Sequence, residues 1–226
     1  MSGSGCVFAV PANCQPFPMS QICGLFPTPL MRVERLLPAP LVQALIARHA
    51  GAAVRRNSQD ARLAHTEILT EESSPELLLL RALLTPKLAE FGELLFGEKL
   101  VWSLKELWLN RLETGGHQAI HNHANCFVSG VLYLTPTDPS ANTVFVKALG
   151  GNGYVFANAH RDTRSGPFNS DKWVAPDAAA GDLILFPSHL LHEVPVNRGG
   201  PRLTLAFNAI PERLDSWGYA LRFARS

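Results

Sequence analysis

The sequence predicts a mostly β protein, α+β by content, in which short strands form a closed sandwich or barrel and N-terminal helices support it. Two observations favour this fold class. From residue 100 onward, short apolar or alternating segments are separated by turns that contain Gly, Pro and Asn, as in antiparallel β proteins. Between residues 40 and 97, apolar residues recur instead at helical spacing.

Composition and charge limit the class of protein. The 226 residues fit one domain, and 46% hydrophobic with 17% charged residues is ordinary for a soluble globular chain. A formal net charge of +1 argues against a nucleic-acid partner. No apolar run is long enough to span a bilayer, so no membrane partner is expected. The four cysteines show no C-x-x-C pairing, so neither a disulfide framework nor a zinc ribbon is indicated, and we expect a reduced, cytoplasmic protein.

The chain is expected to consist of an arm and one domain. Residues 1–24 are rich in Gly, Pro and Ser and lack the features of a signal peptide, which predicts a flexible N-terminal arm. Residues 25–226 are expected to form a single domain. Its expected parts are a strand with supporting helices in 25–99, the barrel in 100–211 and a C-terminal tail in 212–226.

The first elements of that domain have recognisable ends. Residues 26–35 are preceded by prolines and predict an edge strand. A helix is expected to begin at Pro40 and stop at Gly51.

The second helix has a strong start signal. Ser74 is placed to cap it and Pro75 to occupy its first position. Residues 77–96 are apolar at helical spacing, and Gly97 should end the helix. Pro86 should kink or divide it.

The remainder of the chain predicts strands. They are expected at 100–112, 128–134, 143–149, 154–157, 172–176, 183–186 and 202–208. Strict alternation in the first of these puts four side chains on one face: Trp102, Leu104, Trp108 and Asn110. The polar stretch 158–171 between strands is long enough to be a lid or substrate loop.

Histidines at strand spacing indicate a metal site. His121 and His123 are two residues apart, so on extended backbone both imidazoles would point to one face. His192, near the end of a later apolar strand, would complete a facial set of three ligands with positions left open for substrate. Imidazole suits iron, zinc, copper and nickel alike, so the ligands alone do not name the metal. His189, the nearby competitor of His192, is expected to be structural or to lie outside the ligand set.

An arginine on the last strand indicates an anionic ligand. Arg202, Thr204 and Asn208 alternate with apolar residues and share one face. A guanidinium with a hydroxyl two residues further on is suited to bind a carboxylate. Breaking a buried ion pair costs roughly 3–5 kcal/mol, so an inward Arg202 requires an anionic ligand or an acidic neighbour.

These motifs together resemble those of the oxygenases that use Fe(II) and 2-oxoglutarate. The chain resembles one bacterial branch of that superfamily, the 2OG-Fe(II) oxygenases, in five stretches: residues 25–30, 116–123, 128–134, 186–197 and 202–208. The resemblance implies a double-stranded β-helix, the jelly-roll or cupin-like barrel, with helices against one sheet.

The chain departs from the superfamily at one ligand. The usual pair is His-x-Asp or His-x-Glu, whereas His123 stands two residues after His121. If His123 is aligned with the first ligand instead, Asn125 takes the carboxylate position. Either His123, Asn125 or water would then fill that position, and a halide-binding site as in halogenating relatives stays open. Three neutral ligands leave the full charge on the metal, which a dianionic cosubstrate could neutralise.

The resemblance implies a 2-oxoglutarate-dependent dioxygenase that hydroxylates an unidentified small molecule, amino acid or peptide. Fe(II), 2-oxoglutarate and O2 would be consumed or bound, and succinate and CO2 released. The implied metal-binding and catalytic residues are His121, His123 and His192. The implied cosubstrate-binding residues are Arg202 and Thr204, with Asn110 and Tyr133 as further contacts.

Two alternatives and a homodimeric state stay open. A three-histidine metal enzyme of cupin type that needs no 2-oxoglutarate would be favoured by a solvent-facing Arg202. A non-catalytic binding module on the same barrel would be favoured by histidines that point apart.

Overall fold

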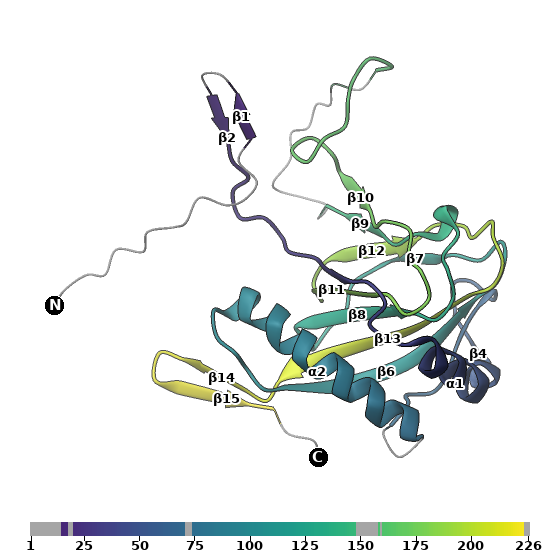
Figure 1. Ribbon diagram of the computed structural model, residues 1–226. Coiled ribbons are helices and arrows are strands. Elements are labelled where there is room, and N and C mark those ends of the chain that lie inside the picture. The colour runs from purple at the N-terminus through teal and green to yellow at the C-terminus, as the bar shows by residue number, and fades with distance from the viewer. Residues whose placement is uncertain (1–14, 18–19, 71–73, 148–157, 159, 224–226) are drawn as a thin grey trace. The chain divides into compact units, whose positions relative to one another are not determined.

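The computed structural model describes residues 15–17, 20–70, 74–147, 158 and 160–223 (Figure 1). The chain divides into two compact units, which are described separately. The first unit comprises residues 1–28 and 159–170, and the second comprises residues 29–158 and 171–226. Among the described residues, no helix is both long and apolar enough to cross a membrane.

The first unit contains a short hairpin and a turn-rich segment. Strand β1 (Gln15–Phe17) pairs antiparallel with β2 (Ser20–Ile22), within the segment that the sequence predicts to be a flexible arm. Cys23 is disulfide-bonded, which the cysteine spacing did not predict. Residues 160–170, part of the predicted lid or substrate loop, form turns and bends without a helix or strand.

The helices of the second unit begin and end close to where the sequence predicts. Helix α1 (Ala39–His49) continues into the short 3-10 helix η1 (Ala50–Ala52). Helix α2 (Pro75–Phe96) ends at Gly97, whose φ of 71° lies in the left-handed region that favours glycine.

Helix α2 has Ser74 as its N-cap residue and Pro75 in its first turn, as predicted, and it runs through Pro86 as one element. Ser74 occupies the N-cap position but makes no side-chain capping hydrogen bond. Its hydroxyl lies 3.2 Å from Nε2 of the buried His49 on α1 instead, so it joins the two helices.

The strands of the second unit form two main antiparallel sheets (Figure 1). The larger sheet has the order β3 (Met31–Val33), β11 (Leu183–Pro187), β8 (Val128–Tyr133), β13 (Arg202–Pro211), β6 (Trp102–Leu112), β5 (Leu63–His65), β4 (Arg55–Arg56). The smaller sheet has the order β10 (Lys172–Val174), β9 (Val144–Val146), β12 (Leu191–Val194), β7 (Gln118–His121). The 3-10 helix η3 (Pro139–Ala141) precedes β9, and a separate hairpin joins β14 (Arg213–Ser216) to β15 (Tyr219–Arg222).

The predicted fold class is confirmed at this level, because the described residues are mostly β with two α-helices and antiparallel sheets. No strand pairing among the described residues closes the two sheets into one barrel. The predicted strand 154–157 lies outside the described residues. The short strands β4 and β5 were not predicted, and the predicted tail contains the β14–β15 hairpin.

The predicted face of strand β6 is wrong because the strand contains a bulge. The register with β13 shifts between Asn208 and Ala209, which pair with Glu106 and Leu104. The extra residue reverses which side chains face the helices. Trp102 therefore packs in the core with α2, whereas Trp108 faces a cavity on the opposite side of the sheet.

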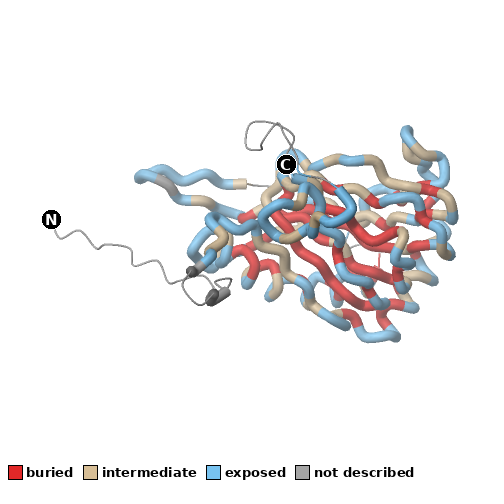
Figure 2. The backbone as a smooth tube through the Cα atoms, turned by 90° about the horizontal axis from the view of Figure 1, so that it is seen from above, coloured by how far each residue is buried: buried red, intermediate tan, exposed pale blue. Residues whose placement is uncertain are grey.

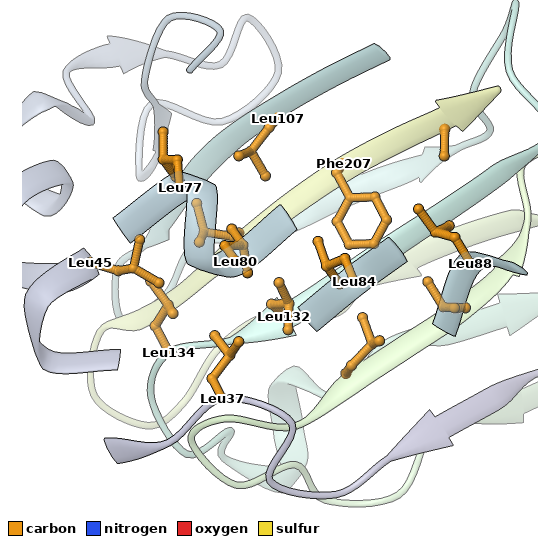
Figure 3. Packing of buried hydrophobic residues seen from close by; sticks show 14 of the residues in the cluster. Leu37, Leu45, Leu77, Leu80, Leu84, Leu88, Leu107, Leu132, Leu134 and Phe207 are labelled. Atoms are coloured by element: carbon orange, nitrogen blue, oxygen red, sulfur yellow. The ribbon is translucent and has the colours of Figure 1, made fainter. Parts of the chain in front are cut away.

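The main core lies between the helices and one face of the larger sheet. Figure 2 shows buried segments along the central strands. Figure 3 shows this packing for Leu45 from α1, Leu80 and Leu84 from α2, Leu132 from β8 and Phe207 from β13. Truncating one such leucine to alanine costs about 2–5 kcal/mol. This core covers one face of the larger sheet, and the other face is available for the site.

Candidate metal centre

Three histidines, two on strands of the smaller sheet and one just beyond a strand end, converge on one point. His121 at the end of β7 and His192 on β12 are cross-strand partners. His123 lies beyond the end of β7, where its backbone N–H donates to the Ser188 carbonyl at 3.0 Å. Candidate ligand atoms of the three side chains all lie within 4.8 Å of one another.

The spacing fits a single metal ion. Nε2 of His123 lies 3.3 Å from Nε2 of His192, and two imidazole nitrogens at right angles on one ion, each at ~2.1 Å, are about 3 Å apart. Two nitrogens this close cannot both carry protons, whereas both can direct lone pairs at one cation. The predicted metal ligands His121, His123 and His192 are therefore brought together.

Hydrogen bonds set the tautomers of two of the rings. Nδ1 of His121 bonds the Ala119 carbonyl at 2.8 Å, and Nδ1 of His192 bonds the Leu190 carbonyl at 2.9 Å. A carbonyl oxygen only accepts, so each Nδ1 carries the proton and each Nε2 presents a lone pair. Such outer contacts are what orient metal-binding imidazoles.

The site also keeps its imidazoles neutral. Burial, and then the neighbouring His121 ring, lower the pKa of His123 to about 4 and that of His192 to about 3. Burial likewise lowers the pKa of His121. Neutral imidazole is the form that binds a metal.

The described part of the chain contributes no carboxylate to this ligand set. Asn125, the alternative ligand, is exposed, has a positive φ of 58° and lines neither cavity near the histidines. His123 thus takes the place next to His121 and His192, and Asn125 does not.

Arg202 is buried on the other wall of the site. Its side chain is 6% exposed, it lies on β13 of the larger sheet, and no carboxylate among the described residues pairs with it. Its Nε has no hydrogen-bond partner, and its guanidinium lies 5.2 Å from the centre of the Tyr133 ring. Burial lowers the pKa of Arg202, an effect that Tyr133 opposes. A buried guanidinium whose N–H has no partner can donate a hydrogen bond to an anion.

The other predicted cosubstrate residues form a row next to Arg202. Thr204 on β13 pairs with Asn110 on β6 on one side and with Tyr133 on β8 on the other. The Tyr133 hydroxyl lies 3.3 Å from Oγ1 of Thr143, and Asn110 accepts a hydrogen bond from the Trp108 indole at 3.1 Å.

Two adjoining cavities meet at the histidines. The inner cavity lies between the sheets and is lined by the three histidines together with Arg202, Thr204 and Asn110. The outer cavity shares His121 and His123 with it and extends toward β4, β5 and residues 66–68. The ligand nitrogens therefore lie between the inner cavity, which holds Arg202, and the more open outer cavity.

Other histidines lie outside this centre. His189 is exposed, and His117 bonds Asp60 through both its backbone N–H, at 2.7 Å, and its Nδ1, at 2.8 Å.

Sequence reasoning missed Glu106 and assigned no role to two other residues near the ligands. Trp108 was placed on one face with Asn110, and Asn208 on one face with Arg202 and Thr204. The Trp108 ring stacks on His123 with centroids 6.0 Å apart, and Glu106 and Asn208 line the outer cavity. The two-residue spacing of Glu106 from Trp108 was the available signal.

The comparison with protein families agrees with these observations. Residues 106–208 match the sequence model of a family described as "Putative 2OG-Fe(II) oxygenase". The resemblance carried by the motifs is thereby confirmed, and the matching segment includes all three histidines and Arg202. No curated protein matches the chain in sequence.

Solved structures with a similar fold include several enzymes. HygX from Streptomyces hygroscopicus, with nickel and 2-oxoglutarate bound, has a TM-score of 0.58 and 15% identity over 81% of this chain and 83% of its own. The α-ketoglutarate-dependent epimerase SnoN from nogalamycin biosynthesis has a TM-score of 0.59 and 15% identity over 82% of this chain and 80% of its own. A Pseudomonas putida prolyl-4-hydroxylase has a TM-score of 0.55 and 19% identity over 80% of this chain and 92% of its own. At these identities the likeness shows a shared fold.

Proposed function

We propose that the chain is an Fe(II)- and 2-oxoglutarate-dependent dioxygenase on a double-stranded β-helix. One observation carries the proposal: Arg202, which is buried, has no carboxylate partner among the described residues and has an Nε without a hydrogen-bond partner, lines the same cavity as three converging imidazoles. Imidazoles suit a divalent metal, and the guanidinium suits a carboxylate at a distance from it. A metal-chelating dicarboxylic acid matches both features.

The residues would have two roles, metal binding and carboxylate binding. His121, His123 and His192 would hold Fe(II) through Nε2, and Arg202 with Thr204 would bind the distal carboxylate of 2-oxoglutarate. When bound, the metal, the cosubstrate and O2 supply the oxidation of a substrate C–H bond, with succinate and CO2 as products.

The charges support this pairing. Three neutral imidazoles leave the double positive charge on a bound metal, and Arg202 adds a further positive charge in the same cavity. Binding a dianion compensates the charge of the metal and the charge of Arg202, and an uncompensated charge is costly in a buried cavity. Asn110 lines the inner cavity next to the cosubstrate position, and the Tyr133 ring contacts the Arg202 guanidinium.

The outer cavity is the proposed substrate site. It reaches the metal ligands at His121 and His123, with the Trp108 ring as part of its wall. Its lining is largely polar and includes Arg55 and Glu67, which suits a small molecule or peptide with hydrogen-bonding groups. The structures of HygX and SnoN with hygromycin B and nogalamycin RO bound support a small-molecule substrate. Hydroxylation is the proposed outcome.

The alternatives lack a supporting observation. A cupin-type enzyme without 2-oxoglutarate requires no buried cation, whereas Arg202 is 6% exposed. A non-catalytic module does not require ligand atoms that converge within 4.8 Å.

The test is 2-oxoglutarate affinity, measured by calorimetry on the Ni(II)-loaded protein. Arg202→Met keeps the volume and removes the charge, so binding should weaken about 10- to 100-fold, the value of hydrogen bonds to a charged group. Arg198→Met is the matched control, because Arg198 is exposed in the turn before the same strand. It should bind like the wild type. Equal affinity of Arg202→Met and wild type, or no 2-oxoglutarate binding by nickel-loaded wild type, would contradict the proposal.

A further inference from the structure

Three side chains of β6 line the path from the outer cavity to the inner one. Glu106, Trp108 and Asn110 alternate along the strand beyond its bulge, while Leu107 and Leu109 between them belong to the main core. Of the two cavities, Glu106 lines the outer one only, whereas Trp108 and Asn110 line both. A molecule in the outer cavity therefore meets a carboxylate and an aromatic ring in the space that two of the metal ligands also line.

The Glu106 carboxylate is held at the wall of the outer cavity. Its Oε2 accepts a hydrogen bond from Nδ2 of Asn208 at 2.8 Å, and Asn208, its cross-strand partner on β13, is 4% exposed. The amide is fixed from its other side, because its Oδ1 accepts from the Ser129 hydroxyl at 2.8 Å. A carboxylate has about four lone-pair positions, so Glu106 can accept further hydrogen bonds.

Lys105 pairs with Glu106 but is not part of the outer cavity. Its Nζ lies 3.3 Å from Oε1 of Glu106, and it lines a different cavity beside Leu77 of α2. The Lys105 and Glu106 side chains are 32% and 35% exposed, so solvent screens the pair and its contribution is small. The carboxylate can therefore attract a second cation from the outer cavity.

The charges around the outer cavity leave an excess of negative charge. Apart from the histidines, the charged side chains among its described lining residues are Arg55, Glu67 and Glu106. Nη1 of Arg55 lies 3.4 Å and 3.2 Å from the two carboxylate oxygens of Glu67, so these two charges compensate each other. The charge that remains for a ligand is that of Glu106.

Trp108 provides an aromatic surface next to this carboxylate. Its ring stacks on His123 with centroids 6.0 Å apart, and its Nε1–H donates to Oδ1 of Asn110 at 3.1 Å. Because its one polar group is already bonded, the ring offers aromatic carbon to a ligand, and tryptophan attracts cations more strongly than the other aromatic residues. Side chains two residues apart on a strand are about 7 Å apart, a spacing that one ammonium group can bridge.

We propose that the outer cavity binds a substrate that carries a protonated amine, and that Glu106 and Trp108 select for this group. The amine would donate to the Glu106 carboxylate beside the Trp108 ring, and the remainder of the substrate would extend toward His121 and His123 in the same cavity. A volume of about 440 Å³ suits a small molecule or a single peptide side chain. This inference rests on the proposed function, because the substrate must reach the metal site.

The test compares two probes of similar shape and opposite charge, benzylammonium and benzoate. Saturation-transfer NMR measures their dissociation constants for the full-length protein with Zn(II) and 2-oxoglutarate, and the wild type should bind benzylammonium more tightly. Glu106→Gln keeps the size of the side chain and removes its charge. It should weaken benzylammonium about tenfold, as expected for a hydrogen bond to a charged group, and should not weaken benzoate.

Two further variants have different expected results. Glu113→Gln is the matched control, because Glu113 is 40% exposed, pairs with the nearby Arg111 at 2.5 Å and lines neither cavity. It should bind benzylammonium like the wild type. Lys105→Met removes the cation that competes for Glu106, so it should tighten benzylammonium binding about two- to fivefold.

A second measurement locates the bound probe. With Ni(II) in place of Zn(II), the paramagnetic ion should broaden the benzylammonium proton signals, and the broadening should decrease in Glu106→Gln. A purely structural role of Glu106 would instead weaken both probes and Zn(II) binding together. That result would overturn the inference, as would signals that Ni(II) does not broaden.

The remaining outcomes separate this inference from the proposed function. Equal affinity of the wild type for both probes, no binding of benzylammonium, or the same loss in Glu113→Gln would overturn the inference and leave the proposed function in place. A wild type that prefers benzylammonium but does not bind 2-oxoglutarate would contradict the proposed function, and the cation selectivity of the outer cavity would stand.

Discussion

Single residues determine the chemistry of the centre through their protonation. The Nδ1 atoms of His121 and His192 are committed to backbone carbonyls, and burial lowers the pKa of all three imidazoles. The protein therefore presents neutral rings with Nε2 lone pairs before any metal arrives. Keeping the buried rings neutral lowers the free energy of unfolding only at acidic pH, where the unfolded chain would bind protons.

The metal-free protein should lose stability as the pH falls. In the unfolded chain a histidine has a pKa of about 6.5, whereas His123 and His192 have pKa values of about 4 and about 3 when folded. Below pH 6.5 the unfolded state binds more protons, so the contribution present at neutral pH is lost progressively down to about pH 3. Thermal unfolding in a chelator from pH 7.5 to pH 4 measures this effect. In His192→Gln the slope should be smaller, and an unchanged slope would contradict the assigned shifts.

The candidate metal ligands and the buried arginine could be predicted from the sequence, whereas the polar residues that surround them could not. The spacing of the histidines in sequence was sufficient to predict that they converge, although His123 lies beyond the end of β7. Alternation determined the face of Arg202 on β13. Glu106 and Asn208 belong to different strands, and only the pairing of β6 with β13 brings them together.

At the scale of elements, the bulge in β6 has the largest consequence for prediction. Alternation read from Trp102 gives the wrong face, because the extra residue near Leu104 reverses it before Trp108. The short strand β12 was also not predicted as separate, and it is the element that pairs His192 with His121. Strand ends set by pairing partners cannot be predicted from local periodicity alone.

Strand β8 carries the packing that keeps the larger sheet close to its core. A Cβ added at Gly130 would collide with the Phe207 ring and would lie 2.8 Å from Cδ2 of Leu185. Gly130→Ala should therefore reduce the free energy of unfolding by about 1–3 kcal/mol through overpacking. Gly51→Ala is the control, because nothing lies within 4 Å of a Cβ there. Urea unfolding of both variants measures the difference, and equal stabilities would show that the sheet can accommodate the extra methyl group.

At the scale of the whole second unit, the site requires both sheets. The smaller sheet supplies His121 and His192 from paired strands, and the larger sheet supplies Arg202 from β13. Helices α1 and α2 cover the far face of the larger sheet, so the near face is left to form the cavity. The mostly β class and the convergence of the histidines were predicted from sequence. Arg202 and the histidines line one cavity because the two sheets face each other, and no local sequence pattern predicts that arrangement.

The measurement that tests this account most directly is the anaerobic visible spectrum of the protein with Fe(II) and 2-oxoglutarate. We predict a charge-transfer band that needs both additions, because the metal site and Arg202 share one cavity. The band should be lost in His192→Ala and retained in His189→Ala, since His189 is exposed and lies outside the ligand set. A wild-type protein that binds Fe(II) without a 2-oxoglutarate-dependent band would contradict the account.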